Sequence, residues 1–429
     1  MRGTARVGVT LAVFAAMLAL VVVRPRRYHE AWWTTLGAAA MLALGLVSPR
    51  EAVEATLSGK NALLFLLSLL ALSLLVGKSG FFDWAAVRSA RVAKGNARAL
   101  YRNAFVLGAV VTATLSLDTT AVILTPIVVA LVKRLKLPAA PYVVMCALVA
   151  NVGSLVLPIS NLTNILFADA FRLTFAAFAA RMVAPQAVAL LTTYALLRWH
   201  FRRELPSRCD DATLAEPASV VPNRAYFAAC VSVLVVVLLG YFLAPLAGIE
   251  PYTVALVGCA VLAVAGVVTG RVGIHAASEL SWGVFPFVVG LFIAVRGIEN
   301  LGVVGASSAW LAKMRPGSPE TLIAAAAATA IASNVVNNLP AALIARRVLV
   351  DSHAHMGTVL AALIGADVGP VITPFGSLAT MLVLALARRA GDGVPTRRFV
   401  MLGLWTAPVI VVATTLALIL ALTSFGGAK

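Results

Sequence analysis

The stretch ANVGSLVLPISNLTNIL, residues 150–166, returns in altered form as ADVGPVITPFGSLATML, residues 366–382. At an offset of 216 residues, Gly153 pairs with Gly369 and Pro158 pairs with Pro374. Both stretches lie in apolar surroundings, and both carry small hydroxyl or amide side chains after the break. Apolar segments interrupted by Gly and Pro at matching places in two halves of a chain indicate the central binding site of a membrane transporter.

The composition predicts a polytopic membrane protein. The chain has 429 residues, of which 61% are hydrophobic and 12% are charged. Successive apolar runs of about 17–25 residues match the thickness of a bilayer, so we expect an all-α membrane domain in contact with lipid. The net charge of +17 does not indicate nucleic-acid binding, because the basic residues lie in short loops between apolar runs.

The cysteines and histidines predict no cofactor, metal site or disulfide framework. The four cysteines form no CxxC pair, and three of them lie in apolar runs, where they are typical small core residues. His353 and His355 form an H-x-H in a polar turn, and a metal site needs more ligands than these two.

Further landmarks repeat between the halves. Gly80 matches Gly302 at an offset of 222, and Asp118 matches Asn338 at an offset of 220. We therefore expect a duplicated chain with a first repeat at 1–197, a polar linker at 198–224 and a second repeat at 225–429. Within the repeats we expect hairpins at 104–132 and 320–350 and broken helices at 139–167 and 356–388.

The basic loops predict the orientation, because cytoplasmic loops are enriched in Lys and Arg. Five basic segments are assigned to the cytoplasm: Arg24/Arg26/Arg27, Lys78–Arg102, Lys133/Arg134/Lys136, Arg198/Arg202/Arg203 and Arg388/Arg389/Arg397/Arg398. This assignment requires 104–132 to enter and leave on one side as a re-entrant hairpin. The result is two inverted repeats with ten spans and two hairpins, both termini outside and the linker cytoplasmic. Arg346 and Arg347 are the exception, since they fall outside.

The breaks carry the expected chemistry. They are explained by Gly153, Pro158, Gly369, Pro370, Pro374 and Gly376, since Pro removes a backbone donor and Gly permits unusual conformations. A broken helix leaves unpaired N–H groups on one half and unpaired C=O groups on the other. Such ends can bind an anion, a cation or a neutral polyol.

Two carboxylates, Asp118 and Asp367, are the candidate proton-coupling groups. A charged side chain at the bilayer centre costs roughly 2.5–3.5 kcal/mol on insertion scales, so its presence indicates function. Removal from water disfavours the charged form of a carboxyl group, which suits a group that takes up and releases a proton in each cycle. The expected substrate-binding residues are Asp118, Thr119, Thr120, Asn151, Ser160, Asn161, Asn164, Asn337, Asn338, Asp367, Thr373 and Ser377.

Four motifs resemble those of the bacterial arsenite efflux permeases, a family of the ion-transporter superfamily. They are GFFDWAAVRSAR (80–91), LPISNLTNILFADAF (157–171), NVVNNLPAALI (334–344) and GADVGPVITPFGSLAT (365–380). The resemblance implies inverted repeats, location in the inner membrane and export of arsenite or antimonite in exchange for protons. It also implies homodimers in relatives and, in some members, a soluble ATPase subunit. Leu117 departs from the family, where an Asn usually precedes the Asp at the first hairpin tip.

One alternative is a sodium- or proton-coupled carrier of carboxylates or another small anion on the same scaffold. The hairpin tips read Asp-Thr-Thr and Asn-Asn-Leu-Pro rather than the Ser-Asn-Thr clusters expected of a sodium carrier. An intramembrane enzyme is not expected, because no motif pairs a nucleophile with a base or groups metal ligands. The uncharged hydroxyls of arsenous acid suit Asn, Ser and Thr side chains.

Overall fold

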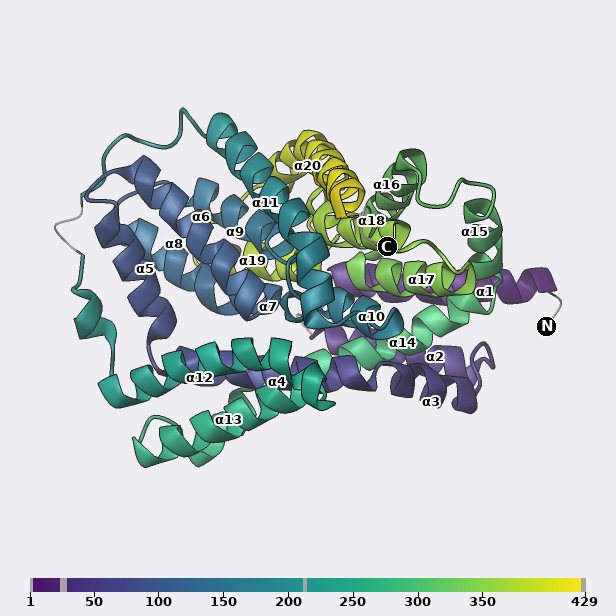
Figure 1. Cartoon of the computed structure of the whole chain (residues 1–429), viewed down its shortest axis with the longest axis horizontal. Coiled ribbons are helices and arrows are strands. Elements are labelled where there is room, and N and C mark those ends of the chain that lie inside the picture. The colour runs from purple at the N-terminus through teal and green to yellow at the C-terminus, as the bar shows by residue number, and fades with distance from the viewer. Residues whose placement is uncertain (1–2, 24–28, 211–213, 426–429) are drawn as a thin grey trace.

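The computed structural model describes residues 3–23, 29–210 and 214–425 and is helical throughout (Figure 1). The first half contains α1 (Gly3–Val23), α2 (Glu30–Ala43), α3 (Pro49–Ser58), α4 (Lys60–Lys78), α5 (Phe81–Val92), α6 (Ala97–Thr114), α7 (Leu117–Thr119), α8 (Thr125–Arg134), α9 (Ala139–Val152), α10 (Leu162–Ala170) and α11 (Phe175–His200). A π-helical turn, Thr120–Leu124, joins α7 to α8. Residues 24–28, which include the first basic segment of the sequence, lie outside the described ranges.

The second half repeats this order. It contains α12 (Arg224–Leu243), α13 (Pro251–Val268), α14 (Val284–Glu299), α15 (Val303–Leu311), α16 (Pro319–Val336), α17 (Asn338–Asp351), α18 (Met356–Val368), α19 (Leu378–Arg389) and α20 (Thr396–Phe425). Gly80 and Gly302 precede α5 and α15 with φ angles of 79° and 80°, in the left-handed region that favours glycine. The two halves therefore share a turn of the same geometry as well as the same sequence of elements.

Seven of the described helices are long and apolar enough to cross a bilayer: α1, α4, α11, α12, α13, α16 and α20. An eighth crossing results if α14 and α15, which are bent by 72° relative to each other, are counted together. The other segments for which the sequence predicts crossings consist of shorter helices, such as α2 with 14 residues and the halves of the two broken segments. The chain is thus an all-α polytopic membrane protein.

Residues 97–134 fold back on themselves as a hairpin. The chain leaves the helical conformation at Ser116, where φ is 174° and ψ is 166°. The Ala97 amide donates to the Ser207 carbonyl at the start of the hairpin, and Lys133 forms an ion pair with Asp392 at its end. Glu204 and Arg398 join these two neighbouring segments by a further ion pair. Both ends of the hairpin therefore lie at the same end of the molecule.

A second hairpin, α16 and α17, turns at Asn337, whose φ of 78° is rare for a residue other than glycine. Its two ends also lie together, since Pro316 and Thr321 line one cavity with Ser352 and His353. Helices α5 to α8 lie towards one end of the long axis and α15 to α17 towards the other (Figure 1). The two hairpins thus approach the middle of the molecule from opposite ends.

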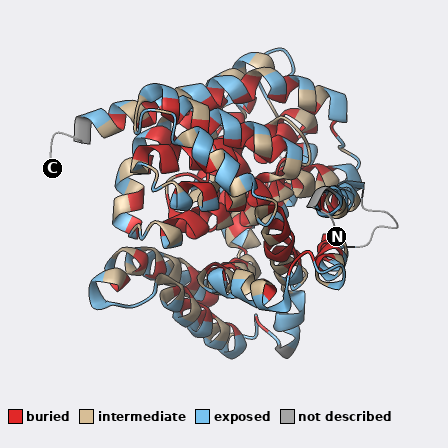
Figure 2. Cartoon of the chain, turned by 90° about the vertical axis from the view of Figure 1, so that its right-hand side faces the viewer, coloured by how far each residue is buried: buried red, intermediate tan, exposed pale blue. Residues whose placement is uncertain are grey.

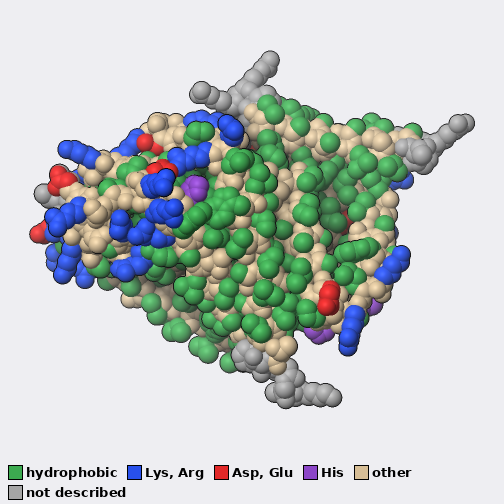
Figure 3. All heavy atoms as spheres, turned by 90° about the horizontal axis from the view of Figure 1, so that it is seen from above, with side chains coloured by type: hydrophobic (Ala, Val, Ile, Leu, Met, Phe, Trp, Pro, Cys, Tyr) green, Lys and Arg blue, Asp and Glu red, His purple; other side chains and the backbone are tan. Residues whose placement is uncertain are grey.

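The outer surface has the character of a lipid-facing protein. Buried residues fill the interior of the helical layers, and exposed ones face outward (Figure 2). Large apolar side chains are exposed along α12 and α13, for example Val236, Leu243 and Val264. Lys and Arg gather at the end that holds α5 and α8 (Figure 3). There Arg91 donates to the carbonyls of Leu214 and Ala215, so this basic end also includes part of the linker.

Helices α16 and α18 pack closely enough to require glycine. A Cβ on Gly365 would lie 2.0 Å from the Ala326 carbonyl oxygen and 2.1 Å from the Thr329 hydroxyl. That hydroxyl donates to the Ala362 carbonyl at 2.7 Å, so the two helices are joined at the same place. The second hairpin is therefore held firmly against the second broken helix.

We expect Gly365→Ala to destabilise the protein, because the added methyl group forces α16 and α18 apart. Overpacking of this kind costs about 1–3 kcal/mol. Gly305→Ala is the matched control, since Gly305 lies in α15 with no atom within 4 Å of its missing Cβ. Thermal unfolding in detergent should show a lower midpoint for Gly365→Ala alone. Equal midpoints for the two variants would contradict the packing.

Candidate functional site

The two broken helices end and resume in the same way. Asn161 precedes α10 with φ −149° and ψ 143°, and Ser377 precedes α19 with φ −140° and ψ 143°. The Asn161 side chain accepts a hydrogen bond from the Thr163 amide, whereas Ser377 makes no such capping bond. Both residues are buried. The break therefore presents a small polar side chain and the start of a helix at equivalent positions in the two repeats.

Asp367 joins the second break to the first. Its Oδ1 atom accepts hydrogen bonds from the Asn161 amide at 3.0 Å and the Thr163 hydroxyl at 2.5 Å. Asp367 is fully buried at the end of α18, while Asn161 and Thr163 lie at the start of α10. The two halves of the chain are thus bonded to each other through one carboxylate, and charge-assisted bonds of this kind are among the stronger ones in proteins.

A related contact runs the other way. Asn151, at the end of α9, donates to the Thr380 hydroxyl at 2.9 Å, and Thr380 lies in the first turn of α19. In both contacts the last turn before one break meets the first turn after the other break. The broken helices therefore cross and hold each other at two places.

A small cavity of about 50 Å³ lies where the breaks and the hairpin tips meet. Its lining includes the starts of four helices: α7 with Asp118, α10 with Asn161 and Thr163, α17 with Asn337 and Asn338, and α19 with Ser377. A water needs about 10–15 Å³ in this measure, so the cavity has room for a small solute. Helix starts expose backbone N–H groups, each equivalent to roughly half a positive charge. These dipoles counter the negative charge of the carboxylates.

The cavity brings together five of the residues that the sequence predicts for the site: Asp118, Asn161, Asn337, Asn338 and Ser377. Seven others surround it without lining it: Thr119, Thr120, Asn151, Ser160, Asn164, Asp367 and Thr373. Asp367 is connected to the cavity through Asn161 and Thr163, both of which line it. Asp118 and Asp367 thus belong to one constellation, with Asp118 in the cavity and Asp367 behind it.

Three of the surrounding hydroxyl groups form hydrogen bonds within the first repeat. The Thr119 hydroxyl lies 2.6 Å from that of Ser73, and the Thr120 hydroxyl lies 2.8 Å from that of Thr112. Ser160 donates to the Leu157 carbonyl at 2.8 Å. These bonds fix the first hairpin tip and the first break, so the three residues shape the site instead of facing a solute.

The helix caps change one pairing between the repeats. Ser116 caps α7 and Asn337 caps α17, which is an offset of 221 instead of the expected 220. Asn338 therefore aligns with Leu117, and Asp118 is one position away from its expected partner. The π-helical turn after Thr119 adds one residue to the first hairpin and restores the smaller offset beyond it.

The second hairpin tip is bonded to the second break. The Asn337 side chain donates to the Phe375 carbonyl at 2.8 Å, and the Asn338 amide donates to the Gly376 carbonyl at 2.8 Å. A side chain on Gly376 would lie 2.7 Å from the Pro370 carbonyl oxygen, so only glycine fits between them. The unusual φ of Asn337 is maintained by these contacts, as is typical of strained residues at functional sites.

Each break is also held by one amide side chain. The Gln186 carbonyl oxygen accepts from the Leu155 amide at 2.7 Å, and its NH₂ group donates to the Val152 carbonyl at 2.9 Å. Asn334 does the same at the second break, accepting from the Thr373 amide at 2.9 Å and donating to the Gly369 carbonyl at 2.8 Å. These two side chains satisfy backbone groups that an interrupted helix leaves unpaired.

The sequence did not indicate Gln186, because it lies within α11, 31 residues from the backbone amide that it binds. Thr163 and Thr380 are also absent from the predicted site, although each makes a bond between the two repeats. Their positions within the repeated stretches were the available signal.

Several buried polar atoms near the site have no hydrogen-bond partner within the described part of the chain: Asn151 Oδ1, Asn164 Oδ1, Asp367 Oδ2, Ser333 Oγ and Ser377 Oγ. Burial of an unpaired polar group is unfavourable. Of these residues, Ser377 lines the cavity, so its hydroxyl is available to a bound solute. Among the described residues, no group of three or more His, Cys, Asp or Glu side chains could hold a metal ion.

Comparison with known proteins assigns the family. Residues 9–422 match the arsenical pump membrane protein family. The chain belongs to this family. An arsenical pump membrane protein of Escherichia coli is 33% identical over 387 residues, covering 87% of this chain and 89% of the relative. A putative arsenical pump membrane protein of Bacillus subtilis (strain 168) is 25% identical over 429 residues, covering 94% and 97%. These matches confirm the resemblance seen in the four motifs.

The fold is also found in a solved structure. The YdaH transporter of Alcanivorax borkumensis, described as having an unusual topology, aligns with a TM-score of 0.57 over 98% of each chain. The sequence identity is 17%, so the likeness concerns the fold alone.

We expect Gln186→Leu to lower stability, because it leaves the Leu155 amide and the Val152 carbonyl buried and unpaired. Each such group costs about 1–3 kcal/mol. Thr193→Val is the matched control, since Thr193 is buried two turns further along α11 and bonds only within that helix. Thermal unfolding of the two variants in detergent compares them. A Gln186→Leu midpoint equal to that of Thr193→Val would contradict the bridging role.

Proposed function

We propose that the protein exports arsenite or antimonite across the inner membrane in exchange for protons, by alternating access. The observation that carries this proposal is the cavity between the hairpin tips and the crossed broken helices, in a chain of the arsenical pump membrane protein family. Related proteins are named as arsenical pumps over nearly the same length. The family thus supplies the substrate class, and the geometry supplies a mechanism.

The substrate fits the chemistry of the cavity. Arsenous acid is an uncharged molecule with three hydroxyl groups near neutral pH, and it needs both donors and acceptors. Asn161, Asn337 and Ser377 provide both kinds of group at the cavity wall. The described cysteines lie away from this wall, so binding relies on hydrogen bonds without a thiolate.

Protons enter the mechanism through Asp118 and Asp367. In the present state Asp367 binds Asn161 and Thr163, which face the cavity. Protonation of Asp367 would weaken these charge-assisted bonds and release Asn161 and Thr163 to the substrate or to solvent. Asp118 lies in the cavity wall and competes directly with the solute for the same donors. Uptake of a proton and release of the substrate are then linked.

Alternating access follows from the opposed hairpins. Each hairpin reaches the cavity from one end of the molecule (Figure 1), so movement of either one opens a path to one side. The proposal includes two inverted repeats at 1–197 and 225–429, both termini outside and the linker 198–224 inside. The gathering of basic segments at one end supports this orientation. A homodimer and a soluble ATPase subunit are further proposals that rest on the resemblance.

A second candidate is a carrier of carboxylates or another small anion. The convergence of four helix starts favours it, because such dipoles attract negative charge. The two carboxylates of the site oppose it, since they repel an anion unless they are protonated. Arsenite is therefore the better substrate for this constellation.

Transport into everted membrane vesicles tests the proposal. We expect uptake of arsenite or antimonite when a proton gradient is imposed and none with a sodium gradient alone. Citrate and sulfate serve as competing substrates. Uptake of either anion, driven by sodium or protons, in place of arsenite would support the alternative carrier.

We expect Asp118→Asn and Asp367→Asn each to abolish the proton-driven component, because an amide cannot take up the coupled proton. Asp351→Asn is the control, since Asp351 is exposed at the end of α17. It should transport like the unmodified protein. Retention of proton-driven transport by the Asp118→Asn/Asp367→Asn double variant would make both carboxylates structural.

A further inference from the structure

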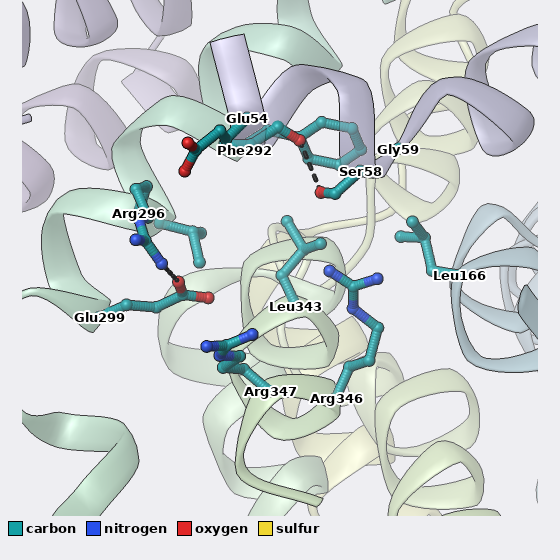
Figure 4. Close-up of a pocket in the computed structure, with 12 residues that line it drawn as sticks. Glu54, Ser58, Gly59, Leu166, Phe292, Arg296, Glu299, Leu343, Arg346 and Arg347 are labelled. Carbon is teal, nitrogen blue, oxygen red and sulfur yellow. Dashed lines mark hydrogen bonds and ion pairs between the residues drawn. The ribbon is translucent and has the colours of Figure 1, made fainter. Parts of the chain in front are cut away.

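A second cavity of about 250 Å³ lies between α3, α14, α10 and α17, apart from the cavity at the hairpin tips. Its charged lining residues are Glu54, Arg296, Glu299, Arg346 and Arg347. Figure 4 shows the two α17 arginines extending towards the space from one side, with Glu54 and Ser58 of α3 across from them. The cavity is therefore polar, and three of its five charged groups are cationic.

The acidic groups of the cavity are paired with other arginines. Glu299 binds Arg296 at 3.1 Å, and Glu54 binds Arg50 at 3.0 Å on the outer face of α3. Arg296 also lies 3.6 Å from Glu51. Within the described ranges, Arg346 and Arg347 form no ion pair, although Asp169 and Glu299 are near enough to influence Arg346 electrostatically.

Two adjacent guanidinium groups without a partner are unfavourable beside an apolar wall. Arg346 is half-buried, and Leu166, Phe292 and Leu343 line the same cavity. A guanidinium group presents paired donors whose geometry matches the oxygens of a phosphate or a related oxyanion. An anion placed between them would neutralise both arginines and satisfy their donors.

We propose that this cavity binds a tetrahedral oxyanion of the phosphate type through Arg346 and Arg347. The volume suits such an ion, because one water occupies about 30 Å³ in the liquid. The same chemistry is offered by free phosphate or arsenate and by the headgroup of an anionic phospholipid. The site goes beyond the proposed transport function, since neutral arsenous acid has no negative charge for the two arginines to bind.

The site is placed to influence the second hairpin. Arg346 lies eight residues beyond Asn338 on α17, which is about 12 Å at 1.5 Å per residue. The other walls belong to α3 and α14, which precede the hairpin and pack on each other. An oxyanion bound here would connect α17 to α3 and α14, so that the hairpin moves less readily.

Thermal unfolding of the purified full-length protein in detergent tests the site. Inorganic phosphate is titrated at constant ionic strength against chloride. We expect phosphate to raise the midpoint of the unmodified protein and of Arg388→Gln/Arg389→Gln, an exposed pair of adjacent arginines on α19. The Arg346→Gln/Arg347→Gln variant should show no such rise. An equal rise in that variant, or no rise in the unmodified protein in any arm, would overturn the proposal.

A charge-retaining variant guards against misfolding of the glutamine variant. Arg346→Lys/Arg347→Lys keeps both charges but loses the paired donors, so we expect a smaller response to phosphate than in the unmodified protein. A full response would overturn the guanidinium-specific site.

Reconstitution distinguishes the source of the anion. The protein is placed in phosphatidylcholine vesicles with and without phosphatidylglycerol. If the occupant is a lipid headgroup, phosphatidylglycerol should raise the midpoint of the unmodified protein alone, and phosphate should add nothing further. If it is a free ion, phosphate should act equally in both vesicles.

Discussion

The structure depends on the carboxylate of Asp367, which is buried completely and bonded to Asn161 and Thr163 of the other repeat. A carboxylate in this position is costly unless it is hydrogen-bonded. Its partners come from the first turn of α10, so the cost is offset only while the two breaks stay together. A change in the charge of this one group therefore alters how the two halves of the molecule hold each other.

The surroundings of this contact are rigid for a physical reason. Interrupting a helix exposes backbone groups that must find partners away from water. Gln186 and Asn334 supply these partners at the two breaks, and the second hairpin tip adds bonds through Asn337 and Asn338. The site can thus keep an open backbone in an apolar setting and still present a defined set of donors to a solute.

Much of this arrangement could be predicted from the sequence. Gly, Pro and carboxylates are rare enough in apolar runs to reveal the breaks, and their repetition revealed the duplication. The contacts that cross between repeats were not visible, because spacing along the chain does not show which turn of α10 meets Asp367. Gln186 was missed for the same reason. The alignment of Asp118 with Asn338 failed by one residue because a π-helical turn lengthens the first hairpin.

The position of a bound antimonite ion tests the central claim most directly, because antimony scatters far more strongly than the protein atoms. A structure determined with antimonite should show the metalloid in the cavity lined by Asn161, Asn337 and Ser377. Antimony density beside Arg346 and Arg347 alone, or on the lipid-facing surface with the central cavity empty, would contradict the account.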